Sequence, residues 1–347
     1  MGAAGGHDRR EAQTGFLERY REALCCPHCG GNLLIRDASV RCGCCGRTYP
    51  IKAGIPMMFC PNEWHTDKQD VTETIRSFYE ENPFPNYDDF DSVGSLIEKA
   101  RQGLFAKLLD DQIPYDSCVL ECGCGTGQLT NFLAVANRTV IGTDLCMSSL
   151  ALAEDFRVRS GLKRACFLQM NLFRPCFKPR SFDLVISNGV LHHTSDPRLG
   201  FRTMAGLVRP GGHLIVGLYD RYGRTFTRMR RAIFRFTEDR FRFLDRRAVD
   251  ERTSAAKRNA WFMDQYKNPH ETAHTIGDVL PWLEESGLSF TRSIPNTVPF
   301  TGMDPHENLF APERVGNRLE RAMVNLASVF TGHREGGFFV VVARKKP

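Results

Sequence analysis

The sequence predicts an α/β protein whose Rossmann-like sheet carries helices on both faces, preceded by a small cysteine-rich ribbon. Three observations lead to this prediction. A short apolar strand at 118–120 runs into a glycine-rich turn that opens a helix. Further apolar strands then alternate with helical patterns along the chain. Two C-x-x-C pairs precede this pattern, and 347 residues suit one domain with an appendage.

The overall composition is that of a soluble globular protein, with 42% hydrophobic and 25% charged residues. Residues 1–13 contain no apolar stretch of the signal-peptide type. No uninterrupted apolar run approaches the roughly 20 residues that span a bilayer. We therefore expect a cytoplasmic protein whose thirteen cysteines are reduced or bind metal.

Residues 22–60 have the pattern of a zinc ribbon, and residues 1–21 before them are expected to be flexible. Cys26 and Cys29 form one C-x-x-C, and Cys42 and Cys45 form the second. A glycine follows each pair and suits the tight turn that points two sulfurs at one ion. Four thiolates at this spacing predict a closed, structural Zn²⁺ site rather than a set of buried free thiols. Either Cys25 or Cys44 is an alternative ligand, because each adjoins a pair.

Residues 61–94 are expected to form a linker or a lid ahead of the main domain, which spans 95–347. A helical pattern begins near Asp70, and the prolines of Asn82-Pro-Phe-Pro end it. A linker explains the polar start of the segment, whereas its aromatic residues suit a lid over an active site. A helix from Ser95 to about Asp111 then leads into the first strand.

The glycine-rich turn is the most informative motif of the chain. Gly123, Gly125 and Gly127 let the backbone pass close beneath a ligand, next to Cys124. Their Gly-x-Gly-x-Gly spacing counts against a dinucleotide pyrophosphate and favours a ligand without phosphates. Two acidic side chains end the first two strands. Glu121 is placed to meet a positive amino group, and Asp144, followed by Leu145, is placed to accept both hydroxyls of a ribose.

These motifs resemble the class I S-adenosylmethionine-dependent methyltransferases, in particular the group similar to the enzymes of ubiquinone and menaquinone biosynthesis. The resemblance spans about residues 95–219 and implies a seven-stranded sheet with S-adenosylmethionine as cofactor. It also implies that Asn171 and Leu172 contact adenine and that Asn188 lies beside the cofactor. Glu121 and Asn171 stand where the family more often has Asp. Residues 22–60 resemble the small zinc-ribbon protein that partners tRNA and release-factor methyltransferases, and similar ribbons precede many bacterial methyltransferases.

Two groups of residues are candidates for the catalytic base. His192 and His193 follow the fourth strand, where a general base would lie beside the cofactor, although they also fit a helix start that packs beneath it. Tyr266, His270 and His274 lie in a loop before the sixth strand that is expected to reach the substrate pocket. The segment from His270 to His274 matches H-E-x-x-H, but a zinc-protease site requires a helix there. Pro269 before it and the capping box of Thr275 and Asp278 after it argue against that helix.

Two insertions, at about 221–265 and 295–335, lengthen the connections of the domain. Between residues 221 and 258 thirteen Lys and Arg stand against five Asp and Glu, although the net charge of the whole chain is only +6. Arginines alternate there with aromatic and aliphatic residues. The segment is expected to be a lid with solvated arginines, or a surface that binds a membrane, RNA or an acidic protein.

The leading functional hypothesis is in-line methyl transfer from S-adenosylmethionine to a small-molecule or lipid-like acceptor. One alternative is a methyltransferase that acts on RNA or protein, which the ribbon and the arginines favour. A second alternative is a non-catalytic scaffold that binds the cofactor or nothing, against which the intact acidic residues and glycines argue. The acceptor atom stays open among carbon, oxygen and nitrogen, because fold does not determine function.

Overall fold

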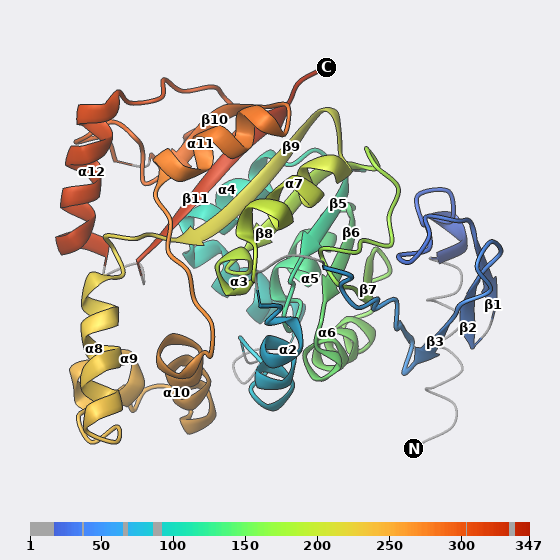
Figure 1. Ribbon diagram of the computed structural model, residues 1–347, viewed down its shortest axis with the longest axis horizontal. Coiled ribbons are helices and arrows are strands. Elements are labelled where there is room, and N and C mark those ends of the chain that lie inside the picture. The colour runs from blue at the N-terminus through green and yellow to red at the C-terminus, as the bar shows by residue number, and fades with distance from the viewer. Residues whose placement is uncertain (1–16, 37, 65–68, 86–91, 303, 333–336) are drawn as a thin grey trace.

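The computed structural model describes residues 17–36, 38–64, 69–85, 92–302, 304–332 and 337–347. Its centre is a seven-stranded sheet with the order β10-β11-β9-β8-β5-β6-β7 (Figure 1). The first five strands of this sheet along the chain are parallel, and β11 runs antiparallel between β9 and β10. The strands are β5 (Cys118–Cys122), β6 (Thr139–Asp144), β7 (Ala165–Gln169), β8 (Phe182–Asn188), β9 (Val208–Tyr219), β10 (Leu288–Ile294) and β11 (Phe338–Lys345).

Helices cover both faces of the sheet. Successive strand residues point to opposite faces, so that both faces carry apolar side chains for helices to bury. Val119 belongs to one buried cluster and Leu120 to the other. The cluster of Val119 packs against α3 (Val93–Gln102), α4 (Leu104–Gln112), α5 (Gln128–Ala134) and α6 (Met147–Arg159). The cluster of Leu120 packs against α7 (Pro197–Leu207) and α11 (Ile276–Glu285). The predicted α/β sheet with helices on both faces is confirmed.

One expected helix is divided in two. The sequence predicted a continuous helix from Ser95 to about Asp111, but α3 ends and α4 begins at Gly103, whose ψ of 113° is extended. Because glycine weakens a helix interior, the chain turns at this residue while Leu96 and Leu109 both stay in the core. Both helices still lead into β5.

The cysteine-rich segment forms a small antiparallel sheet that packs on the β7 edge of the main sheet (Figure 1). Its strands are β1 (Leu33–Arg36), β2 (Ser39–Cys42), β3 (Thr48–Lys52) and β4 (Ile55–Pro56). Met57 makes an isolated parallel bridge to Gln169 in β7, and Leu24 makes an antiparallel one to Phe177. Of the segment expected to be flexible, residues 1–16 lie outside the described residues, whereas Leu17 is buried in the same core cluster as the ribbon.

The two insertions form helices at one end of the molecule (Figure 1). The first contains α8 (Thr225–Phe236), η2 (Arg242–Leu244), α9 (Arg246–Val249), α10 (Ala255–Phe262) and the π-helix η3 (Met263–Lys267), and the second contains α12 (Arg318–Thr331). The first insertion has its own small core of Phe234, Phe262 and Tyr266. Within the described residues, no helix is both long and apolar enough to cross a membrane.

Candidate active site and metal centre

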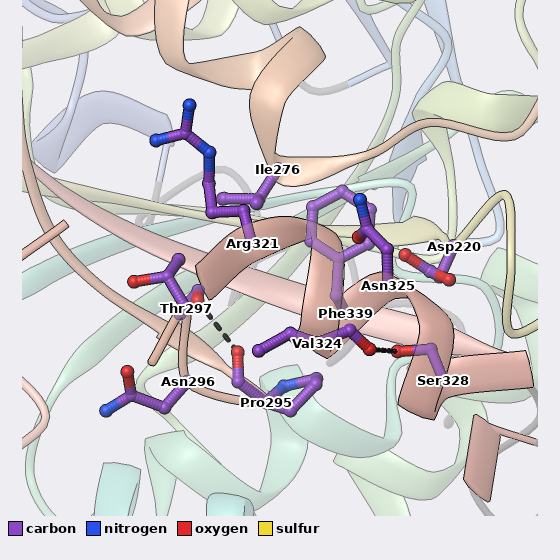
Figure 2. A pocket seen from close by; sticks show the side chains of 11 residues that line it. Asp220, Ile276, Pro295, Asn296, Thr297, Arg321, Val324, Asn325, Ser328 and Phe339 are labelled. Carbon is purple, nitrogen blue, oxygen red and sulfur yellow. Dashed lines mark hydrogen bonds between the residues drawn. The ribbon is translucent and has the colours of Figure 1, made fainter. Parts of the chain in front are cut away.

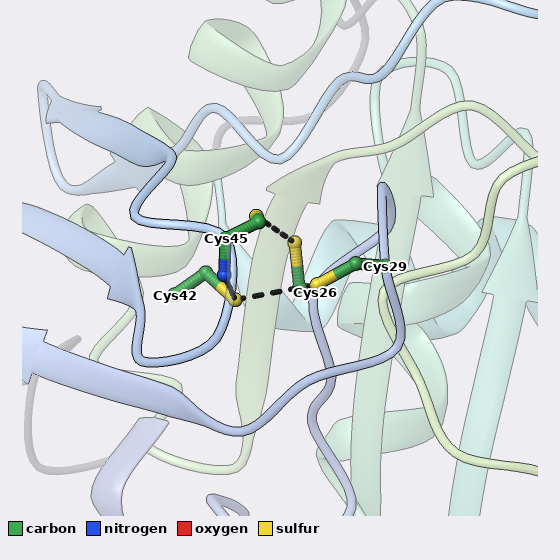
Figure 3. Close-up of side chains that lie close together, drawn as sticks. All are labelled: Cys26, Cys29, Cys42 and Cys45. Carbon is green, nitrogen blue, oxygen red and sulfur yellow. Dashed lines mark hydrogen bonds between the residues drawn. The ribbon is translucent and has the colours of Figure 1, made fainter.

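Four cysteines of the ribbon converge on one point (Figure 3). The sulfurs of Cys26, Cys29, Cys42 and Cys45 all lie within 4.8 Å of one another. Cys26 Sγ is 3.8 Å from Cys45 Sγ, and Cys29 Sγ is 3.5 Å from Cys42 Sγ. Four sulfurs at about 2.3 Å from a tetrahedral Zn²⁺ would lie about 3.8 Å apart. The donor set and its spacing therefore fit a structural zinc ion.

Local backbone geometry holds these sulfurs in place. Backbone N–H groups of Cys44 and Cys45 donate to Cys42 Sγ at 3.3 and 3.4 Å, as in a tight turn. Cys44 itself points to solvent. Cys25 is buried on the other side, and its N–H donates to the carbonyl of Cys176 in the main domain. Among the described residues, the cluster of sulfurs within 4.8 Å of one another includes neither Cys25 nor Cys44.

A cavity of about 480 Å³ opens at the carboxyl ends of the parallel strands. Its lining includes most of the predicted cofactor residues: Glu121, Gly123, Cys124, Gly125, Asp144, Leu145, Leu172 and Asn188. Ligands of open α/β sheets bind at this edge, where the strand order reverses between β5 and β8. The glycine-rich turn and the acidic strand ends thus meet in one cavity.

Glu121 lies at the end of β5 and is almost fully buried, with 7% of its surface exposed. Thr130 Oγ1 donates a hydrogen bond to its carboxylate. Burial raises the pKa of Glu121 to about 7, and the Thr130 contacts only partly oppose this shift. A cationic group in the cavity would stabilise the ionised form, so the site is suited to a positively charged amine.

Asp144 ends β6 and closes the glycine-rich turn. Its carboxylate accepts hydrogen bonds from the backbone N–H groups of Gly125 at 2.8 Å and Cys146 at 2.9 Å. Burial raises the pKa of this carboxyl group, while these hydrogen bonds favour the ionised form. Asp144 also belongs to the cavity lining.

The glycines of the turn are required for different close approaches. A Cβ on Gly125 would lie 2.3 Å from the carbonyl oxygen of Phe84, and one on Gly127 would lie 2.6 Å from Ala153 and Phe167. Gly127 also adopts a φ of +72° as it begins α5. Gly127 therefore allows the helix to pack, although it is not part of the cavity lining, whereas Gly125 allows the preceding segment to cross the turn.

That preceding segment covers the cavity. The helix α2 (Thr72–Glu81) contributes Ile75 and Tyr79 to the lining, and Phe84 and Pro85 follow. The Glu80 carboxylate accepts hydrogen bonds from the N–H groups of Met147 and Ser148 at 2.7 and 2.9 Å. Glu80 thus caps α6 directly after the Asp144 loop, and this contact ties α2 to the part of the cavity wall that contains Asp144.

Asn171 is directed away from the cavity. Its amide donates to Cys60 O at 2.9 Å and to Asn62 Oδ1 at 2.7 Å, and its own oxygen accepts from Phe173 N. The neighbouring Leu172 does line the cavity, together with Met170. The predicted contact of Asn171 with adenine therefore has no geometric support, since its polar atoms hold the segment before α2.

The two adjacent histidines have different environments. The backbone N–H of Tyr219 donates to His192 Nδ1 at 3.2 Å, and the His192 ring stacks on the Tyr219 ring at 3.7 Å. His192 is completely buried and is not part of the cavity lining. His193 lines the cavity, and its Nδ1 lies 2.8 Å from the carbonyl oxygen of His270.

These contacts also assign the protons of both rings. A carbonyl oxygen only accepts, so His193 Nδ1 carries the proton and its Nε2 keeps a lone pair. Burial lowers the pKa of His193, which keeps the ring neutral near pH 7. His192 has the opposite tautomer, because its Nδ1 accepts from a backbone N–H. Of the two histidines, only His193 is part of the cavity lining.

Tyr266, His270 and His274 are not in the cavity lining. The Tyr266 hydroxyl donates to Asp245 at 2.8 Å within the core of the first insertion. His270 contributes its backbone carbonyl to His193, and His274 Nε2 lies 2.9 Å from Thr272 Oγ1. Residues 270–275 are not helical, which excludes the geometry of a zinc protease.

A buried polar network that the sequence did not identify forms another wall of the cavity. Asp264 accepts from the Tyr79 hydroxyl at 2.7 Å and from Gln265 Nε2 at 2.8 Å. Gln265 Nε2 also lies 3.0 Å from the Tyr219 hydroxyl, and all four side chains line the cavity. Asp264 and Gln265 lie in the π-helix η3, an element that is often found at functional sites. No local sequence pattern marks these residues, because α2, β9 and the first insertion each supply part of the network.

A second cavity lies between α12 and the main sheet (Figure 2). Its volume is about 20 Å³, which suits a single water molecule rather than a ligand. Two hydroxyl groups at its wall are already paired, since Ser293 Oγ donates to Pro295 O at 2.7 Å and Ser328 Oγ donates to Val324 O at 3.0 Å. This cavity is a packing feature of the second insertion.

The fold and the site define the central part of the chain as a Rossmann-like methyltransferase domain. The strand order and the acidic and glycine-rich strand ends are those expected for that class. Residues 120–216 match the family model described as "Methyltransferase domain". The chain therefore carries a class I S-adenosylmethionine-dependent methyltransferase domain.

Curated relatives agree with this assignment over part of their length. An uncharacterized protein of Synechococcus is 32% identical over 196 residues, which cover 50% of this chain and 47% of that protein. A ubiquinone biosynthesis O-methyltransferase of Serratia proteamaculans is 31% identical over 107 residues, covering 31% of this chain and 44% of the enzyme. The chain thus spans about half the length of the curated relatives it matches.

Among solved structures, the magnesium protoporphyrin IX methyltransferase of Synechocystis with bound SAH is similar at 15% identity. The alignment covers 79% of this chain and 99% of that one, with a TM-score of 0.45.

Proposed function

We propose that this protein transfers the methyl group of S-adenosylmethionine to a small-molecule or lipid-like acceptor. The observation that carries the proposal is one cavity lined by the carboxylates of Glu121 and Asp144 and by His193, whose Nδ1 contacts the carbonyl oxygen of His270. When bound, S-adenosylmethionine supplies an activated sulfonium methyl group that a nucleophile attacks in line.

The residues at the strand ends would bind and orient the cofactor. Glu121 would pair with the amino group of its methionine part, and Asp144 would accept from the ribose hydroxyls. Leu145 and Leu172 would pack on the adenine. Residues of α2 would act as a lid that excludes water, because Tyr79 and Phe84 cover the same cavity.

His193 would remove the proton of the acceptor. Its lowered pKa supports this role, since a neutral imidazole is available at physiological pH. The role implies an acceptor whose nucleophilic atom carries a proton, such as a hydroxyl oxygen. The aromatic lining of Tyr79, Phe84, Trp261 and Phe338 favours a flat, partly apolar acceptor over RNA or protein.

Calorimetric titration with S-adenosylhomocysteine tests the cofactor part of the proposal. We expect Asp144→Asn to weaken binding by at least about 10-fold, the value of one lost hydrogen bond to a charged group. Asp155→Asn, an exposed carboxylate on α6, is the matched control and should bind as the parent does. Absence of binding by folded, zinc-loaded protein would exclude the enzyme and favour a scaffold.

Production of S-adenosylhomocysteine tests the acceptor part. Fractions of small molecules and lipids, of RNA and of protein are offered separately to the parent protein and to His193→Gln. We expect turnover with the first fraction only, and a loss of about 100-fold or more in the variant with unchanged cofactor affinity. Turnover confined to the RNA or protein fraction would contradict the proposed acceptor class.

A further inference from the structure

The helix α8 has two apolar faces, and only one of them packs against the protein. On the inner face, the Phe234 ring lies 5.5 Å from Phe262 and 4.7 Å from Tyr266. On the outer face, Met229, Ile233 and Phe236 follow one another at spacings of four and three residues, which places them on one side of the helix. Phe236 is 86% exposed and Met229 is 56% exposed.

More exposed apolar side chains directly follow the helix. Phe241, Phe243 and Leu244 all face solvent, and Phe243 is 63% exposed. A single exposed apolar residue is ordinary, but a contiguous group rimmed by charge marks an interaction surface. The first insertion therefore presents an apolar surface that no described residue covers.

The arginines of the insertion are divided between its two sides. The inward Arg224 and Arg231 both bind the buried Glu271, at 2.7 and 2.8 Å. The outward Arg228, Arg235, Arg240 and Arg246 are exposed, and none makes an ion pair with a described acidic side chain. The positive charge that remains unneutralised therefore rims the exposed apolar side chains.

We propose that this α8 surface binds an anionic lipid membrane. It is defined by the apolar Met229, Ile233, Phe236, Phe243 and Leu244 and by the basic Arg228, Arg235, Arg240 and Arg246. A helix with aliphatic and aromatic side chains on one face and arginines beside them lies in the interface plane of a bilayer. The apolar side chains enter the boundary of the acyl chains, and the guanidinium groups meet lipid phosphates.

The composition of the stripe favours a membrane over RNA. Nucleic-acid surfaces combine basic residues with aromatic side chains on which bases stack. Here aliphatic Met229 and Ile233 occupy two of the three positions of the stripe on α8, and these side chains offer no stacking platform. They do gain free energy when they leave water for an acyl phase.

The same insertion also forms part of the cavity wall, through Arg247 and Trp261. Binding of the α8 surface would bring this wall to the bilayer, where a lipid-like acceptor resides. This consequence rests on the proposed function, whereas membrane binding itself does not.

Vesicle co-sedimentation of the full chain tests the inference. The vesicles are phosphatidylcholine with and without phosphatidylglycerol. We expect binding only to the anionic vesicles, weakened by added salt. Arg235→Glu with Arg240→Glu should weaken it by more than about 10-fold, because each basic residue near such a surface contributes about one factor of five. Phe236→Ser should weaken it as well.

Matched variants separate this surface from general charge and hydrophobicity. Arg36→Glu with Arg202→Glu makes the same change of net charge on exposed arginines elsewhere, and Phe300→Ser removes a phenylalanine that is 98% exposed. Both controls should bind vesicles as the parent does. Unchanged affinity for S-adenosylhomocysteine and an unchanged unfolding midpoint would show that the variants are folded.

The inference would be overturned by no binding to anionic vesicles, by equal loss in the variants and their controls, or by vesicle-independent binding of RNA that the Arg235 and Arg240 changes abolish. A change from dimer to monomer in Phe236→Ser, without vesicle binding by the parent, would assign the surface to a second copy of the chain and also overturn it. Asp144→Asn should keep full vesicle binding. Failure of methyl transfer with vesicle binding retained would therefore reject only the proposed function.

Discussion

Replacement of Glu121 by Gln should change how the stability of the unliganded protein depends on pH. The Glu121 carboxyl is buried, and burial raises its pKa from 4.5 to about 7. The folded protein therefore holds a proton there that the unfolded chain releases at lower pH. Stability from this group is fully present below about pH 4.5 and is lost as the pH rises through about 7. Gln keeps the shape and an acceptor for Thr130 but does not ionise.

The magnitude follows from the shift in pKa. At 1.36 kcal/mol for each pKa unit, the ionised Glu121 lowers the free energy of unfolding by about 3 kcal/mol at pH 8. At pH 5 the ionisation of Glu121 lowers the free energy of unfolding by less than about 1 kcal/mol. The parent protein should thus lose about 2 kcal/mol more stability than Glu121→Gln between pH 5 and pH 8. Other titrating groups are common to both proteins and cancel in this comparison.

Urea unfolding at pH 5, 6, 7 and 8 measures the effect, with zinc present and the ligand absent. Glu98→Gln is the matched control, because Glu98 is an exposed carboxylate on α3. Its curve should run parallel to that of the parent. Saturating S-adenosylhomocysteine should narrow the difference in stability at pH 8 by about 1.4 kcal/mol or more, since its ammonium group favours ionised Glu121 and the variant should bind it at least about 10-fold more weakly.

Parallel pH curves for Glu121→Gln and the parent would refute the reasoning. They would mean that the carboxyl is hydrated in the unliganded cavity, so that burial does not raise its pKa. If the pH curves of the parent and of Glu121→Gln diverge but both proteins bind S-adenosylhomocysteine equally well, burial does raise the pKa of Glu121. The amino group of the ligand would then contact another residue.

The remaining predictions concern elements that hold the site in place. Cys42→Ser should abolish zinc binding, whereas Cys44→Ser should keep one zinc per chain in a metal assay, because only Cys42 lies in the cluster. Glu271→Ala should lower the free energy of unfolding by about 3 kcal/mol or more, measured by urea titration, because it leaves buried Arg224 without its carboxylate. Glu80→Ala should speed proteolysis of residues 72–85 about 5-fold through the loss of roughly 1 kcal/mol of capping, while the exposed Glu81→Ala on the same helix should not.

The parts of the molecule that could be predicted from the sequence are those whose structure is set by residues close together along the chain. The turn from Glu121 to Gly127 is a local strand-turn-helix unit, and its glycines are needed for backbone geometry that no other residue adopts without strain. The zinc ligands are equally local, since each C-x-x-C pair forms within one turn and the two turns lie in one hairpin. The succession of apolar strands along the chain then predicts that the acidic residues at the strand ends lie together at the carboxyl edge of the sheet.

The choice between His192 and His193 was beyond the sequence, because both are histidines in the same turn. What separates them is the carbonyl of His270, 77 residues further along the chain, and the backbone N–H of Tyr219. Whether Tyr266 and His274 reach the substrate pocket depended on how the first insertion packs. Tyr266 is buried in the small core of that insertion. The adenine contact of Asn171 was predicted from the resemblance to a family, but the amide of Asn171 donates hydrogen bonds to the segment before α2.

The sequence by itself determined the sheet, the glycine-rich turn, the two acidic strand ends and the cluster of four cysteines, because short-range backbone requirements and apolar periodicity specify them. Only the tertiary structure decided which histidine faces the cavity, that Tyr79 and Asp264 share one of its walls, and that α8 keeps an uncovered apolar face. Tyr79 and Asp264 are 185 residues apart, and their hydrogen bond exists only because the lid and the insertion pack on the same strand ends. Contacts of this kind depend on the packing of whole elements, which no local pattern encodes.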